Sequence, residues 1–203
     1  MKKRHLLLLL MALAMVPLAM KAQTTQLVQV TSLEVGSTYV ITATYSGTQY
    51  AMGNTVYNTS NNHYVSTAAF SASNTTETAI QWKVISGNAT DGYIFQNVGN
   101  SKYLGYTSDE YLSVVDSGGT AHTYDGTYLK NNVDSEGYYW VSIKDATCFT
   151  TSKSTSESCN IVIYKLVTGY SITLSQPSGG TISASVAGGT ATTSSTAVSW
   201  FRI

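Results

Sequence analysis

Charged side chains are scarce in this sequence: only 11% of its 203 residues are Asp, Glu, Lys or Arg. Beyond residue 22, the 11 acidic side chains outnumber the Lys and Arg, which are scattered singly. Binding to nucleic acid or to an anionic membrane depends on clustered positive charge. We therefore expect neither as a partner.

Motifs for catalysis and cofactor binding are also missing. The chain has no nucleophile elbow, no Gly-rich phosphate loop and no H-E-x-x-H pair. Most carboxylates stand beside Gly, Ser or Asn, in turns where Asp normally accepts hydrogen bonds from the backbone. We predict a protein without enzymatic activity, cofactor or metal.

Cysteine is limited to Cys148 and Cys159, which are too few and too far apart for a C-x-x-C redox or zinc motif. A disulfide between them would close a short loop and contribute about 3 kcal/mol in the chain-entropy model. Two buried thiols on neighbouring strands are the alternative. The sequence leaves both possibilities open.

The longest apolar run lies at the start of the chain. Basic residues precede an apolar stretch from Leu6 to about Val16, and small residues follow as far as Ala22. The apolar stretch is shorter than the roughly 20 residues that cross a bilayer. Residues 1–22 are therefore predicted to be a cleaved signal peptide, and no membrane-spanning segment is expected. Such a protein would be secreted or displayed at the cell surface.

Tyrosine and hydroxyl residues dominate what remains, including 15 Tyr. Alternating aromatic and hydroxyl residues favour half-buried strands, so we predict an all-β protein. A polar lead-in, 23–35, can pair as an edge strand. Gly- and Asn-containing turns separate eleven further predicted strands, at 39–45, 49–52, 63–70, 79–85, 93–98, 103–106, 111–115, 127–130, 138–143, 147–150 and 160–166.

Three stretches resemble one another. The segment Asp91–Gly105 reads as strand, Gly/Asn/Lys turn and strand, and it is echoed from Tyr39 and more faintly from Tyr138. Such repeats predict a barrel of three four-strand units. Aromatic residues would end the fourth strands, with Trp82 in the first unit and Tyr164 in the third.

The segment from Tyr93 to Leu104 resembles the hairpin framework of the ricin-type β-trefoil lectins. The resemblance as a whole covers about residues 36–167. This resemblance implies a β-trefoil barrel with pseudo-threefold repeats. The lectins place a sugar-binding aspartate after the Lys-x-Leu segment, where this chain has Gly105. Their Gln-x-Trp signature is absent as well. The resemblance therefore implies the fold more strongly than the galactose site.

Residues 168–203 have a different character, with a strand, a Pro-Ser-Gly-Gly turn and a second strand. This pattern resembles the beginning of the divergent B-type repeats of bacterial surface proteins. The resemblance implies a partial β module or tail, with the possibility of further domains after the chain end.

A binding site is predicted where Tyr, His and carboxylates concentrate in the middle unit. Aromatic rings stack on sugar rings, and polar side chains bind the hydroxyls. The predicted ligand-binding residues are Tyr106, Asp109, Tyr111, Tyr124 and Asp125. Packing within strands is the alternative for each tyrosine. An amide-rich loop at 54–64 is a second candidate, and Trp82 and Trp140 are assigned to the core.

These features predict an exported, non-catalytic module that binds a glycan or another extracellular ligand such as a protein. One alternative is a structural or targeting domain of a larger surface protein. Another is a protease inhibitor that acts through one exposed loop. Nothing in the sequence identifies the ligand.

Overall fold

The computed structural model describes residues 24–59, 62–73, 75–106, 111–131, 140–171 and 200–201. These residues form β-strands and two short 3-10 turns, with no α-helix among them. The predicted all-β class is confirmed. No helix in this part of the chain is long and apolar enough to cross a membrane.

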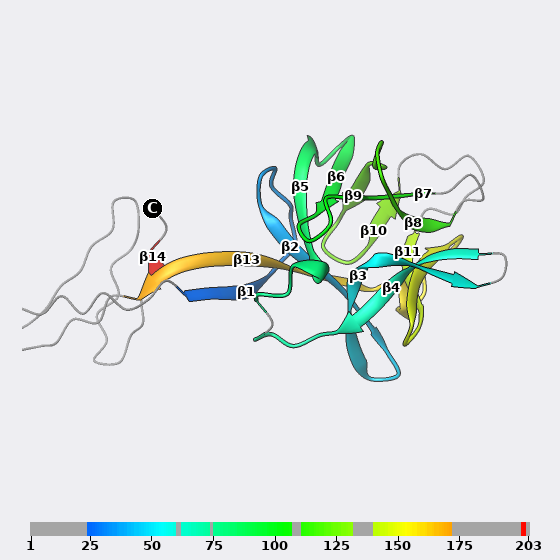
Figure 1. Ribbon diagram of the computed structural model, residues 1–203, viewed down its shortest axis with the longest axis horizontal. Coiled ribbons are helices and arrows are strands. Elements are labelled where there is room, and N and C mark those ends of the chain that lie inside the picture. The colour runs from blue at the N-terminus through cyan, green and yellow to red at the C-terminus, as the bar shows by residue number, and fades with distance from the viewer. Residues whose placement is uncertain are drawn as a thin grey trace, which may run out of the picture. The chain divides into compact units, whose positions relative to one another are not determined.

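Thr25–Val167 form one compact part of the chain (Figure 1). The 3-10 turns are η1 (Thr78–Ile80) and η2 (Glu157–Cys159). The strands are β1 (Thr24–Val30), β2 (Thr38–Tyr45), β3 (Thr48–Thr59), β4 (Asn62–Ala69), β5 (Gln81–Asn88), β6 (Gly92–Asn97), β7 (Tyr103–Tyr106), β8 (Leu112–Val115), β9 (His122–Tyr124), β10 (Leu129–Asn131), β11 (Trp140–Asp145), β12 (Cys148–Ser152), β13 (Ile161–Ser171) and β14 (Trp200–Phe201).

Six of these strands follow one another in a ring. Antiparallel pairing joins β13 to β2, β2 to β5, β5 to β6, β6 to β9 and β9 to β10. The backbone N–H of Ile161, at the start of β13, donates to the carbonyl of Thr127, just before β10, at 2.8 Å. This hydrogen bond connects the two ends of the ring.

Six further strands extend three of the ring strands as ribbons. β2 pairs with β3 and β3 with β4, and the same order recurs in β6–β7–β8 and in β10–β11–β12. Two of the ribbons also meet, because β4 pairs with β12. The same succession of pairings thus occurs three times along the chain.

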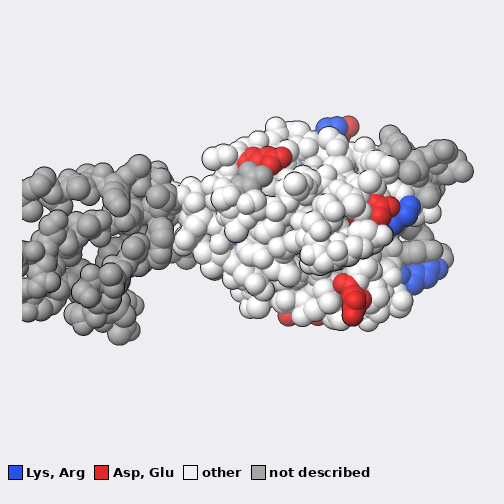
Figure 2. Space-filling model, turned by 90° about the horizontal axis from the view of Figure 1, so that it is seen from below, with Lys and Arg blue, Asp and Glu red and all other residues white. Residues whose placement is uncertain are grey.

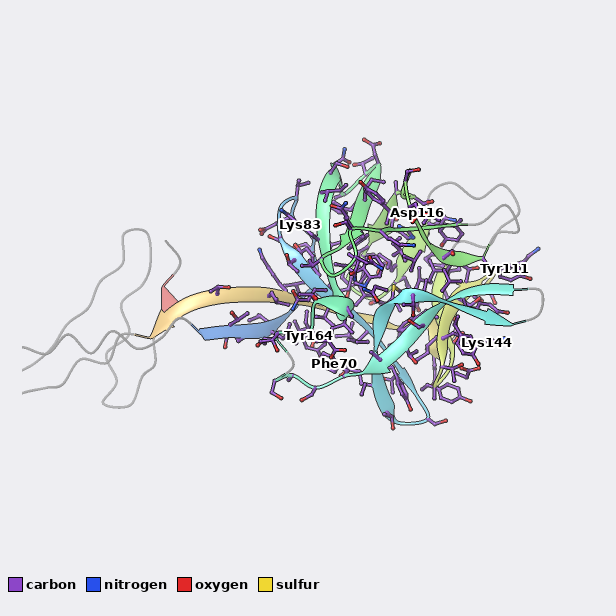
Figure 3. The ribbon with its side chains drawn as sticks, in the orientation of Figure 1. Phe70, Lys83, Tyr111, Asp116, Lys144 and Tyr164 are labelled. Atoms are coloured by element: carbon purple, nitrogen blue, oxygen red, sulfur yellow. The ribbon has the colours of Figure 1, made fainter. Side chains whose placement is uncertain are left out.

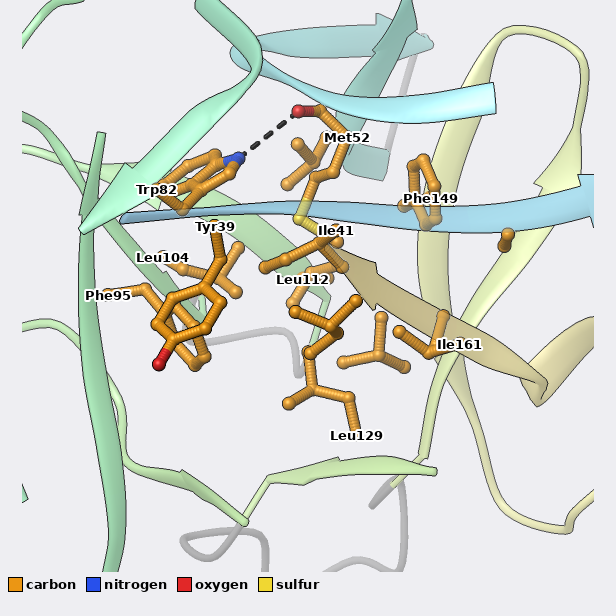
Figure 4. Packing of buried hydrophobic residues seen from close by; sticks show 14 of the residues in the cluster. Tyr39, Ile41, Met52, Trp82, Phe95, Leu104, Leu112, Leu129, Phe149 and Ile161 are labelled. Atoms are coloured by element: carbon orange, nitrogen blue, oxygen red, sulfur yellow. Dashed lines mark hydrogen bonds between the residues drawn. The ribbon is translucent and has the colours of Figure 1, made fainter. Parts of the chain in front are cut away.

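Alternating apolar residues from these strands fill the centre. Trp82, Tyr39, Phe95 and Phe149 are fully buried, and Figure 4 shows them around Met52 and several aliphatic side chains. The indole Nε1 of Trp82 donates to the Met52 carbonyl at 3.1 Å, so burial does not leave this donor unpaired. The assignment of Trp82 to the core is confirmed.

All eleven predicted strands of this part overlap observed strands, and the lead-in forms β1, a neighbour of β13. The interpretation of 54–64 as a loop was wrong, because β3 continues to Thr59 and β4 begins at Asn62. His122–Tyr124 were not among the predicted strands, but these residues form β9, between β6 and β10. The third echo, from Tyr138, leads into β11. That strand pairs with β10 before it and so corresponds to β3 and β7, not to β2 and β6.

The other compact part, at the two ends of the chain, contributes few described residues. Here the end of β13 pairs with β14, with Tyr170 opposite Phe201 and Ser171 opposite Trp200. The predicted signal peptide and residues 172–199 of the predicted partial repeat lie outside the described residues.

Candidate functional site

Two of the predicted ligand-binding tyrosines support the fold. Tyr106 at the end of β7 packs against the core, and its ring stacks on His122 with centroids 5.8 Å apart. The Tyr124 hydroxyl donates to the carbonyls of Gly126 and Ile161, each at 3.1 Å. The hydrogen bond to Ile161 links the end of β9 to the beginning of β13. Both rings are half-buried, and the described contacts hold the Tyr106 ring against the core and the Tyr124 hydroxyl against backbone carbonyls.

His122 is completely buried beside Tyr106 and makes an edge contact with Phe95. Its Nδ1 lies 2.8 Å from the Thr120 carbonyl, which can only accept, so Nδ1 carries the proton. Nε2 has no hydrogen-bond partner within the described ranges. Desolvation lowers the pKa of His122 to about 4, although the bond to Thr120 opposes this shift.

Asp125 and Tyr111, two of the remaining predicted ligand-binding residues, have different surroundings. Asp125 is exposed, and its Oδ1 accepts from the backbone N–H groups of Thr127 and Tyr128 at 2.9 and 2.7 Å. Tyr111 contacts Tyr64 edge-on, with centroids 5.5 Å apart. Asp109 lies outside the described residues. The structure does not bring Tyr106, Tyr111 and Tyr124 into one described site.

Tyr111 belongs instead to a small group formed by three segments far apart in sequence. Lys144 at the end of β11 donates from Nζ to the Tyr64 hydroxyl at 3.2 Å, and Nζ lies 4.3 Å from the Tyr64 ring centroid. The hydrogen bond to Tyr64 is the main cause that raises the pKa of Lys144. Figure 3 shows Tyr111 and Lys144 at the same end of the molecule.

A second aromatic group lies on β10, β11 and β12. Lys130, Trp140 and Ser152 are directly opposite one another on these strands, so their side chains share a face. Tyr128 meets Trp140 edge-on at 5.4 Å, and the Lys130 Nζ lies 5.5 Å from the Trp140 ring. We call Tyr128, Lys130, Trp140 and Ser152 the outer aromatic face.

The alternation of burial distinguishes this face from the core. Leu129 and Val141 point inward and are fully buried, whereas Tyr128, Lys130 and Trp140 are half-buried. The assignment of Trp140 to the core was therefore wrong. Its position next to the buried Val141, in a strand that alternates, was the signal that could have indicated its outward direction.

Asp125 is a predicted ligand-binding residue that lies beside the outer aromatic face. Its two backbone hydrogen bonds set the turn that carries Tyr128, so the carboxylate is held near this tyrosine. No described residue donates to its second oxygen, Oδ2. The outer aromatic face thus combines two aromatic rings, an ammonium and a hydroxyl, and the turn that holds the Asp125 carboxylate adjoins it.

Gly105 occupies the place where the lectins have an aspartate, and its surroundings leave no room for a side chain. A Cβ atom there would lie 2.7 Å from Cγ2 of Val115, which is too close for real structures. Gly53 on β3 is similarly enclosed, with the Ser66 hydroxyl 2.6 Å from an added Cβ. Packing thus explains the glycines at these positions.

Cys148 and Cys159 are both buried and free. The Cys148 thiol lies 3.9 Å from Asp145 Oδ1, and the Cys159 thiol lies 3.6 Å from the Ser154 carbonyl. Desolvation is the main cause that raises the pKa of Cys148, and a raised pKa disfavours the reactive thiolate.

Acidic and basic side chains are scattered over the face seen in Figure 2, without a patch of one sign. Within the described ranges, Lys102 forms an ion pair with Asp116, and Lys165 forms one with Glu34. Comparison of the chain with models of known protein families gave no match, and comparison with curated proteins gave none either.

Proposed function

We propose that this chain is an exported, non-catalytic carbohydrate-binding module built on a β-trefoil over residues 36–167. The succession of pairings supports the fold: in each four-strand unit the first and fourth strands belong to the ring, and the first three form a ribbon. A β-trefoil repeats this arrangement three times around one axis.

The outer aromatic face is the observation on which the carbohydrate proposal depends. Trp and Tyr rings stack on the C–H face of a sugar, and nearby polar side chains bind its hydroxyls without a deep cavity. Trp140 and Tyr128 supply the rings. The Lys130 ammonium lies over Trp140 and can donate, and the Asp125 carboxylate in the adjoining turn can accept. The Ser152 hydroxyl, opposite Trp140, donates to the Ser154 carbonyl and can still accept.

The carboxylates of the described turns support a non-catalytic role. Asp125 and Asp145 each accept hydrogen bonds from backbone N–H groups two or three residues further along the chain. Asp91 accepts from the Asn88 side chain within the β5–β6 turn. A general acid or base needs a carboxyl group directed at substrate, and these three stabilise turns instead.

A glycan array probed with the full-length protein tests this proposal. Trp140→Ala and Tyr128→Ala are each expected to weaken binding to the preferred glycan at least about tenfold, since each removes a stacking surface worth about 1.4 kcal/mol. Tyr45→Ala is the matched control, because Tyr45 is a 39% exposed tyrosine at the β2–β3 turn. Its affinity should stay within about twofold of the unmodified protein.

Absence of binding to every glycan, or binding indifferent to both face substitutions, would contradict the proposal. The alternative of a structural or targeting domain would then be favoured.

A further inference from the structure

A shallow hollow lies between two of the four-strand units, away from the outer aromatic face. Its volume is about 270 Å³, and it is lined by Asn54, Thr55, Val56, Asn100, Lys102 and Val114. The first three residues come from β3, the next two from the β6–β7 turn and Val114 from β8. We infer that this hollow is a separate binding site for a single uncharged sugar ring.

Asn97 holds the polar lining in place. This asparagine is 1% exposed, and its Oδ1 accepts from the Asn54 side chain at 3.0 Å and from the backbone of Gly99 at 2.8 Å. Its Nδ2 donates to the carbonyls of Ala79 and Gln81 at 2.9 and 3.0 Å. The buried amide thereby joins β3, the β6–β7 turn and the start of β5.

The two asparagines of the lining are also joined directly. Asn100 Nδ2 donates to the Asn54 carbonyl at 2.8 Å, and Asn100 Oδ1 accepts from the Lys102 backbone at 3.0 Å. A register shift in β3 between Met52 and Val56 places Asn54 in an irregular part of the strand. Such irregularities often redirect side chains beside binding sites. The polar groups are thus oriented before any ligand arrives.

The unused hydrogen-bonding capacity of the lining matches the hydroxyls of a sugar. Among described contacts, Asn54 Oδ1 has no donor, and each of the two lining amides has a second N–H available. Thr55 Oγ1 donates to Ser66 at 2.8 Å and can still accept. Val56 and Val114 supply apolar contact for the C–H face of a ring.

The charge of the hollow favours a neutral ligand. The Lys102 ammonium is paired with Asp116 at 2.9 Å, and Asp116 is labelled in Figure 3. An anionic ligand would compete with this carboxylate, whereas a hydroxyl can accept from the remaining N–H groups of the ammonium. The volume also lies just below the ~300–1,000 Å³ of typical small-molecule pockets, which suits one ring.

Amide NMR shifts of the full-length protein can test this inference with the methyl glycosides of glucose, galactose, mannose and N-acetylglucosamine. At least one should shift the amides of Asn54, Thr55 and Asn100, with a Kd of about 1–10 mM for so shallow a site. Lys102→Met should weaken this binding about fivefold by removing one charged donor. Lys83→Met is the matched control, because Lys83 is an exposed lysine that does not line the hollow.

Asn100→Ala provides a second variant, also expected to weaken binding about fivefold. Thermal unfolding of each variant shows that the fold is retained. Absence of shifts at the hollow with all four glycosides, or equal binding by Lys102→Met and Lys83→Met, would overturn the inference. Tighter binding of glucuronic acid than of glucose would overturn the neutral class. The inference does not depend on the outer aromatic face: Trp140→Ala should leave the hollow's shifts unchanged.

Discussion

Replacing Trp82 with alanine is expected to lower the free energy of unfolding by about 3–5 kcal/mol, the range for large aromatic residues removed from a core. Trp82 is 0% exposed and pairs with Tyr39 on one side and Asn97 on the other. The substitution opens a cavity where strands β2, β5 and β6 meet. It also leaves the Met52 carbonyl without the indole donor at 3.1 Å.

Urea unfolding followed by circular dichroism measures this loss. Trp140→Ala is the matched control, since it removes the same side chain from a half-buried position and should cost less than about half as much. Trp82→Phe separates the effect of the cavity from that of the lost hydrogen bond, because phenylalanine retains most of the ring volume but has no indole N–H. Equal losses for the two alanine variants would contradict the assignment of Trp82, and not Trp140, to the core.

Acidifying the solution from pH 7 to pH 4 is expected to remove about 3 kcal/mol of stability through His122 alone, at ~1.4 kcal/mol per pH unit. The folded protein holds the pKa of His122 at about 4, against an ordinary value of 6.5. Above pH 6.5 the imidazole is neutral in both states, and this stability is fully present. Between pH 6.5 and 4 only the unfolded chain binds the proton, so stability falls.

The test compares the stability of the unmodified protein with that of His122→Phe at pH 7, 6, 5 and 4. Phenylalanine can keep the ring contacts with Tyr106 and Phe95 but does not titrate. Carboxylates such as Asp145, whose pKa is lowered chiefly by the Thr147 hydroxyl, are present in both proteins and cancel in the difference. Parallel pH profiles of the two proteins would refute a neutral, buried His122.

Strand positions followed from the sequence because they depend on local alternation. In β6, Tyr93 and Phe95 point inward while Ile94 is half-buried, and the Gly/Asn turn after Asn97 ends the strand. Strand β9 was not predicted because its three residues, His-Thr-Tyr, include no aliphatic residue, whereas the equally short β10 contains Leu129. Its pairing of His122 with Tyr93 depends on a strand far away in sequence.

The third echo was placed one strand late for a related reason. Strand β10 contains only Leu129–Asn131, whereas β11 is longer and begins with Trp140. The longer strand β11 therefore gives the clearer sequence pattern and resembles the start of a unit. The strand predicted at 127–130 precedes it, but only the pairing of Lys130 with Trp140 shows that this short strand begins the third unit.

Of the predicted ligand-binding residues that the structure describes, only Asp125 adjoins the proposed site. The sequence indicated that aromatic and polar residues of the middle unit could bind sugars, and Asp125 lies next to the outer aromatic face. Composition cannot distinguish a tyrosine whose hydroxyl links two strands, such as Tyr124, from one whose ring packs against an outward-pointing tryptophan, such as Tyr128. That difference depends on which residues of other strands come close.

The sequence by itself determined the all-β class, the place of nearly every strand and the turns between them, because alternation and turn residues act over a few neighbours. The tertiary structure alone decided the order of strands in the ring, the burial of His122 and the outward direction of Trp140. It also brought Asn54 and Asn100 together around the buried Asn97 amide. These properties arise from contacts between residues far apart in the chain, and no local pattern records them.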